Sequence, residues 1–71
     1  SFTNGTADNL ADMILEDLRE GGMATSDTVA DGIDYPALSV TAKMQEMERR
    51  GVIYKCTFYA ADPADFDRYE A

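Results

Sequence analysis

The side chains best suited to chemistry in this sequence are a few cations and one amide in its central part. They are Lys43, Gln45, Arg49, Arg50 and Lys55, accompanied by the small residues Ser39 and Ala42. Arginine and lysine bind phosphate oxygens, glutamine can pair with adenine, lysine with guanine, and alanine can contact a thymine methyl group. These residue types could serve nucleic-acid recognition or merely keep the surface soluble, and the types alone do not decide between the two.

Enzymatic chemistry finds little support in the residue types. The sequence has no histidine and a single cysteine, Cys56, in an apolar segment beside Lys55. A serine or cysteine nucleophile activated by histidine is therefore excluded, and we expect Cys56 to be a small core residue. Gly21 and Gly22 are not followed by the Lys-Ser or Lys-Thr pair of a phosphate-binding loop. We expect a protein that is not an enzyme and has no cofactor.

Acidic residues near the end of the sequence raise the question of a cation site. They are Asp62, Asp65, Asp67 and Glu70. Their spacing lacks the central glycine and the downstream bidentate glutamate of a calcium-binding loop. Because Asp62 and Pro63 can open a short helix, capping explains most of these acids, and we expect no metal site.

The length and charge of the chain define its class. Its 71 residues suffice for one domain, and its net charge of −8 argues against general affinity for nucleic acid. The charge is unevenly distributed, because residues 1–34 carry eight acidic side chains and one basic one, whereas residues 35–55 carry four basic and two acidic ones. The one basic stretch therefore lies inside an acidic molecule.

The sequence predicts a cytoplasmic protein without membrane contact. Its apolar runs are far shorter than the roughly 18 residues of a membrane span. Residues 1–6 are polar and lack the basic and apolar regions of a signal peptide, and a lone cysteine agrees with a reducing compartment. We expect residues 1–6 to form a frayed N-terminus and residues 7–71 to form a single domain.

Hydrophobic spacing predicts that a first helix runs from about residue 7 to residue 20. Leu10, Ile14 and Leu18 fall on one of its faces, and a pair of glycines follows as the stop signal. The opposite face carries acidic residues at four-residue spacing. We interpret this face as solvated, with an acidic docking surface for a basic partner as the alternative.

Two further helices follow, after a token strand at residues 23–24. Thr25 is the expected N-cap of a helix that buries Val29 and Ala30 and ends at Gly32. The next helix is expected over residues 36–50, between Pro36 and Gly51. Its core stripe is predicted to be Ala37, Val40, Met44 and Met47, with Leu38 pointing outward.

The chain then changes to a β pattern. Residues 52–60 are rich in β-branched and aromatic types, and we expect them to form one strand. A short acidic helix is expected after Asp62, anchored by Phe66 and Tyr69.

Several of these residues match a known pattern. They are Thr25, Ser26, Val29, Ala30, Ser39, Val40, Met44 and the run from Met47 to Ile53. The segment resembles the winged helix-turn-helix of bacterial and archaeal transcription regulators, especially the leucine-responsive regulatory protein and antibiotic-resistance-regulator types. The resemblance implies a mainly helical fold with a small β component. Its expected parts are a three-helix core, a short strand, one longer strand with a truncated wing, and a short C-terminal helix.

The resemblance also implies that helix 36–50 reads the major groove of double-stranded DNA. Ser39, Ala42, Lys43 and Gln45 would then lie near bases, and Arg49, Arg50 and Lys55 would meet phosphates. A regulator of this type works as a dimer, and the terminal helix or the exposed edge of strand 52–60 would supply the contact.

Some residues depart from the pattern and keep a second hypothesis open. Asp27, Asp31 and Asp34 would lie close to the phosphate backbone, where negative charge is unfavourable. Leu38 stands where the family usually has a small polar residue, and with Ala42 it makes a modest apolar patch. The alternative is an acidic protein-interaction module of the same fold, which uses its acidic surface, with or without Leu38 and Ala42, to bind a basic protein partner or mimic nucleic acid.

Overall fold

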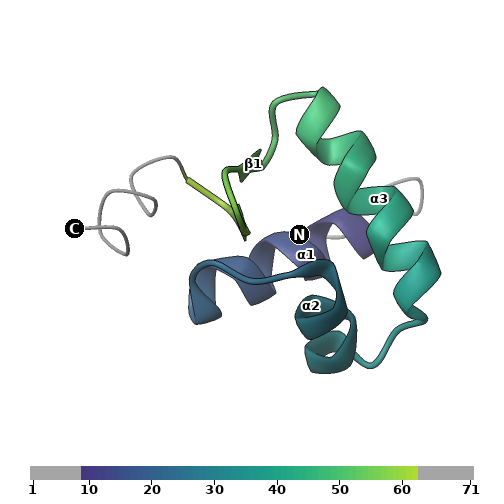
Figure 1. Cartoon of the computed structure of the whole chain (residues 1–71). Helices are drawn as coiled ribbons and strands as arrows, with labels where there is room; N and C mark the ends of the chain where they lie inside the picture. Colours follow the sequence, from purple (N-terminus) through teal and green to yellow (C-terminus); the bar gives the residue numbers. More distant parts are fainter. Residues whose placement is uncertain (1–8, 63–71) are drawn as a thin grey trace.

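A computed structural model describes residues 9–62, and within this range the chain is mainly helical (Figure 1). Its elements are helices α1 (Asn9–Gly21), α2 (Ser26–Ile33) and α3 (Ala37–Arg49), then strands β1 (Tyr54–Lys55) and β2 (Tyr59–Ala60). The predicted mainly helical fold with a small β component is confirmed at this level. The expected N-terminal segment and C-terminal helix, with Phe66 and Tyr69, lie outside the described residues.

Helix α1 buries the face that its spacing predicts. Ile14 and Leu18 are fully buried, and Leu10 is partly buried against the same core. The helix ends where Gly22 adopts a φ of 82° and its N–H donates to the carbonyl of Leu18 at 2.8 Å. The predicted glycine stop is therefore confirmed. Among the helices of residues 9–62, none is long and apolar enough to cross a membrane.

Helix α2 begins as predicted and ends slightly later. The hydroxyl of Thr25 accepts the N–H of Thr28 at 3.2 Å, so Thr25 is the N-cap. Asp34 takes the left-handed conformation at the other end, with a φ of 57°, and the predicted end at Gly32 is wrong by one residue. Gly32 serves a different purpose, because a Cβ there would lie 2.8 Å from the carboxylate of Asp17 on α1.

Helix α3 carries most of the remaining core. Val40, Met44 and Met47 are buried as predicted, whereas Ala37 is exposed, so its assignment to the core stripe was wrong. Ala37 is the first residue of the helix, and the buried stripe begins one turn later at Val40. After Arg49 the chain turns at Gly51, whose φ of 77° allows the backbone to close against the last turn.

Residues 52–60 do not form the single strand that their composition predicts. They form a tight hairpin in which Tyr54 pairs with Ala60 and Lys55 pairs with Tyr59. Within the turn, the N–H of Cys56 donates to the carbonyl of Phe58 at 3.3 Å. The hairpin is favoured because it lets the backbone of β2 form hydrogen bonds on both sides, with β1 on one and with Ala24 on the other.

Strand β2 lies between β1 and Ala24. The short strand predicted at residues 23–24 is present as a single β-bridge between Ala24 and Tyr59. The N–H of Ala24 donates to the carbonyl of Tyr59 at 2.9 Å, and the N–H of Tyr59 donates back at the same distance. Cys56 lies in the exposed turn, so the prediction that it is a core residue was wrong. The chain reverses direction at residues 56–58, so Cys56 lies in the turn and not in a strand that faces the core.

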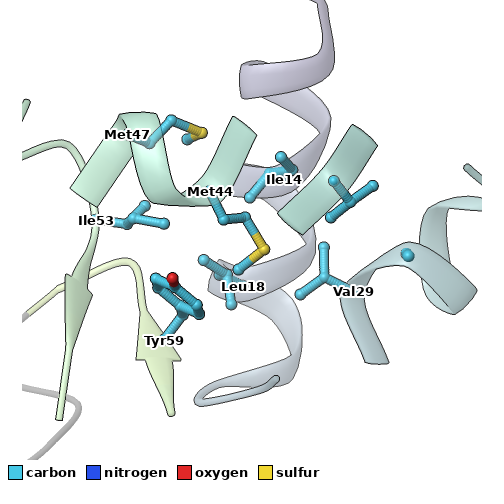
Figure 2. Close-up of a cluster of buried hydrophobic side chains, with 9 residues drawn as sticks. Ile14, Leu18, Val29, Met44, Met47, Ile53 and Tyr59 are labelled. Carbon is cyan, nitrogen blue, oxygen red and sulfur yellow. The ribbon is translucent and has the colours of Figure 1, made fainter. Parts of the chain in front are cut away.

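The three helices, strand β2 and Ile53, which precedes β1, contribute to one core (Figure 2). Its largest members are Ile14, Leu18, Val29, Met44, Met47, Ile53 and Tyr59. A hydrogen bond of 2.8 Å between the hydroxyls of Ser26 and Thr41 adds a polar link between α2 and α3. The core and this link fix the orientation of α3, which holds most of the candidate site.

Candidate nucleic-acid interface

The side chains of α3 that face away from the core form two parallel rows. The outer row is Leu38, Ala42, Gln45 and Arg49, and the flank row is Ser39, Lys43, Glu46 and Arg50. Members of each row follow the spacing i, i+4, i+7 and i+11, which keeps them within about 60° around a helix. Both rows therefore have a fixed direction relative to the core.

The outer row lies opposite the buried residues. All four of its side chains are exposed, and Leu38 has 87% of its surface accessible. From Leu38 to Arg49 the row extends roughly 16 Å along the helix axis. It begins with an apolar pair, continues with an amide and ends with a guanidinium group. These groups form a continuous strip that a partner could contact along its whole length.

The flank row is partly neutralised within itself. The ammonium group of Lys43 lies 3.2 Å from the carboxylate of Glu46, and only 17% of the Lys43 side chain is exposed. Lys43 was expected to project outward with the other cations, and the structure instead covers most of it. Its pairing with Glu46, three residues later, holds the side chain along the helix surface. Ser39 and Arg50, at the two ends of this row, are exposed.

The hairpin adds a cation beside the C-terminal end of α3. The ammonium group of Lys55 lies 4.9 Å from the ring centroid of Tyr59, a distance suited to a cation–π contact. The hydroxyl of Tyr59 donates to the carboxylate of Glu48 on α3 at 3.5 Å. Burial of the ring, and then the negative charge and hydrogen bond of Glu48, raise the pKa of Tyr59 above its usual 10.0. Tyr59 thus connects the hairpin cation to the helix.

Acidic side chains lie on α2 and in the turn that leads into α3. Asp27 and Asp31 on α2 and Asp34 before α3 are all exposed. The first turn of α3 itself contains no acidic residue. Because exposed charges act over about 8 Å at physiological salt, phosphate contact is most favourable at the C-terminal half of α3 and the hairpin.

A second feature lies between α1 and α2, away from the cations. It is an open groove of about 380 Å³, which we call the acidic groove. Its lining residues are Met13, Glu16, Asp17, Glu20, Gly32 and Ile33. Nowhere in residues 9–62 do three histidine, cysteine, aspartate or glutamate side chains gather closely enough to hold a metal ion. The groove therefore combines an apolar floor with negative charge.

The candidate residues from the sequence divide into separate groups in the structure. Ala42, Gln45 and Arg49 share the outer row, and Arg50 and Lys55 lie toward the same end of α3. Lys43 is held by Glu46. The sequence reasoning left Leu38 out of the site, although its outward direction was predicted from helical spacing. Its presence in the outer row makes it part of any surface that uses Ala42 and Gln45.

The chain was compared with protein-family models, with curated proteins and with solved structures, and none of them matches it. The features of the described residues that bear on function are therefore the rows of α3, the hairpin and the acidic groove.

Proposed function

We propose that this chain is a DNA-binding domain of a cytoplasmic transcription regulator, without catalytic activity, and that α3 reads the major groove of double-stranded DNA. The observation that carries the proposal is the exposed outer row of α3, in which Gln45 and Arg49 project from a rigid helix. Arg50 and Lys55 add two exposed cations near the same end. Groups of this kind in this order fit base edges followed by phosphates.

The arrangement of the backbone supports a winged helix-turn-helix. Helices α2 and α3 are joined by a short turn, and the bridge from Ala24 to Tyr59 sets β2 between residue 24 and β1. The hairpin follows α3 in the chain (Figure 1), and we propose that it serves as the wing. Its exposed turn carries Phe58 and Cys56 rather than basic residues. We propose that Lys55 is the hairpin's contact with phosphate.

The strength of this binding follows from the number of available cations. Arg49, Arg50 and Lys55 would release about three counterions, so the plot of log affinity against log salt would have a slope of about −3. Between about 50 and 200 mM salt the affinity would then fall roughly 40-fold. Binding this weak at physiological salt supports a dimer, and the outer edge of β1 offers a backbone for pairing with a second copy.

Fluorescence anisotropy with a labelled duplex of mixed sequence tests the proposal. We expect binding at low salt with a slope near −3, and Arg49→Gln should make the slope about one unit shallower. Arg19→Gln is the matched control, because it removes the same charge from α1, on the acidic part of the chain. Equal effects of the two variants, or no binding at low salt, would refute the proposed role of α3.

The acidic groove supports a second candidate function, an interaction module for a basic protein. Its apolar floor can take the aliphatic stem of a lysine or arginine, and Glu16, Asp17 and Glu20 can pair with the charged end. A labelled lysine-rich peptide added in place of the duplex distinguishes the two functions. The module predicts peptide binding that is lost when Glu16 and Glu20 are both changed to glutamine, while the duplex stays unbound.

A further inference from the structure

The outer row of α3 contains an apolar pair that the fold does not use. Leu38 is 87% exposed, and Ala42 follows one turn later on the same side of the helix. The core is already filled from this helix by Val40, Met44 and Met47. Because Leu38 is exposed, it contributes almost no buried apolar area to the stability of the fold. Its side chain is therefore available to an external partner.

We infer that Leu38 and Ala42 select DNA that contains thymine, by contacting its C5 methyl group in the major groove. This inference depends on the proposed DNA-binding function and names its base preference. Thymine is the one base that presents a methyl group in that groove, and small apolar side chains are its usual contacts. Gln45, the next member of the outer row, has the amide that pairs with adenine, the partner base of thymine.

The spacing of the row agrees with such a contact. Leu38 and Ala42 are separated by about 6 Å along the helix axis. Successive base pairs are separated by 3.4 Å along the duplex, so the two side chains reach bases about two steps apart. The N-terminal part of a recognition helix is also the part that approaches base edges in helix-turn-helix complexes.

Charge decides between DNA and other partners for this apolar pair. The outer row continues from the pair to Arg49, with Arg50 beside it. DNA fits both halves of this strip, because its thymine methyl groups can contact the apolar pair and its phosphates can pair with the arginines. A second copy that paired through the same strip would offer Arg49 no counter-charge, because the outer row contains no acidic side chain.

Duplexes that differ by one methyl group test the inference. The probes are an alternating adenine–thymine duplex, the same duplex with uracil in place of thymine, an alternating guanine–cytosine duplex and its 5-methylcytosine form. Each methyl group in contact should contribute about fourfold in affinity, so loss of two contacts should weaken binding about 15-fold. Adding the methyl group to cytosine should strengthen binding in the same direction.

The variant Leu38→Ser gives the decisive comparison, because serine replaces the apolar side chain by a polar one. It should reduce the thymine-to-uracil preference from about 15-fold to about fourfold, because only Ala42 keeps its contact. Arg49→Gln should weaken binding to thymine and uracil duplexes by the same factor and leave their ratio unchanged. Comparing the ratio between variants removes any effect of uracil on the duplex itself. Circular dichroism of Leu38→Ser checks that its helices are intact.

The outcomes separate this inference from the proposed function. Equal affinity of the original chain for thymine and uracil duplexes, with salt dependence retained, overturns the thymine contact and leaves DNA binding standing. A preference that persists undiminished in folded Leu38→Ser overturns the role of Leu38. Absence of binding to every duplex at low salt overturns the proposed function together with the inference.

Discussion

Truncation of two leucines to alanine should have very unequal consequences for stability, because one leucine is in the core and the other is on the surface. Leu18 has 0% of its surface exposed and lies among Ile14, Met44 and Tyr59 in Figure 2. Its replacement removes buried carbon atoms worth roughly 2 kcal/mol and leaves a cavity, for a total loss of about 2–5 kcal/mol. A chain of this length has a free energy of unfolding of about 4–11 kcal/mol, so Leu18→Ala removes a large part of it.

The same truncation at Leu38 should cost little. With 87% of the side chain exposed, the lost burial is about 0.3 kcal/mol, and the better helix propensity of alanine offsets part of it. Urea denaturation followed by circular dichroism measures both free energies of unfolding. A loss below about 0.5 kcal/mol for Leu18→Ala, or a loss for Leu38→Ala as large as that expected for Leu18→Ala, would show that the described core is wrong.

Three further changes test separate parts of the structure. Gly51→Ala should destabilise the chain by about 1 kcal/mol, because the φ of 77° is unfavourable for alanine, whereas Gly21→Ala should be neutral or stabilising; urea denaturation compares them. Changing both Asp27 and Asp31 to asparagine should strengthen duplex binding in anisotropy titrations, and unchanged affinity would place α2 away from phosphates. The folded chain holds the phenolic proton of Tyr59 more tightly than the unfolded chain, so this stabilisation is full below pH 10.0 and is lost as the pH rises through the raised pKa. Denaturation across that range should therefore show a steeper loss of stability for the original chain than for Tyr59→Phe, and parallel curves would contradict the raised pKa.

The three helices could be predicted from the sequence because their signals are local. Thr25 caps α2, a glycine follows α1, and Val40, Met44 and Met47 keep the spacing of one helical face. The hairpin was missed for a physical reason. Its turn at residues 56–58 contains no glycine, proline, asparagine or aspartate, and a continuous strand would also place Ile53 and Tyr59 on the same side. The backbone bonds between Tyr59 and Ala24 are long-range and leave no mark in the local pattern.

The outward direction of the site side chains could be predicted from the sequence, but the exposure and pairing of each side chain could not. Helical spacing is enough to put Leu38, Ala42, Gln45 and Arg49 on the outside. The covering of Lys43 depends on how closely neighbouring elements approach its stem and on its pairing with Glu46. These contacts depend on tertiary packing, so spacing alone overstated the number of cations available to a partner.

Amide chemical-shift mapping during titration with a duplex tests the central claim most directly. The account predicts that shifts concentrate on the outer row of α3 and on Lys55, and that they disappear as salt is raised. Shifts concentrated on Glu16 and Glu20 in the acidic groove, or no shifts at low salt, would contradict it.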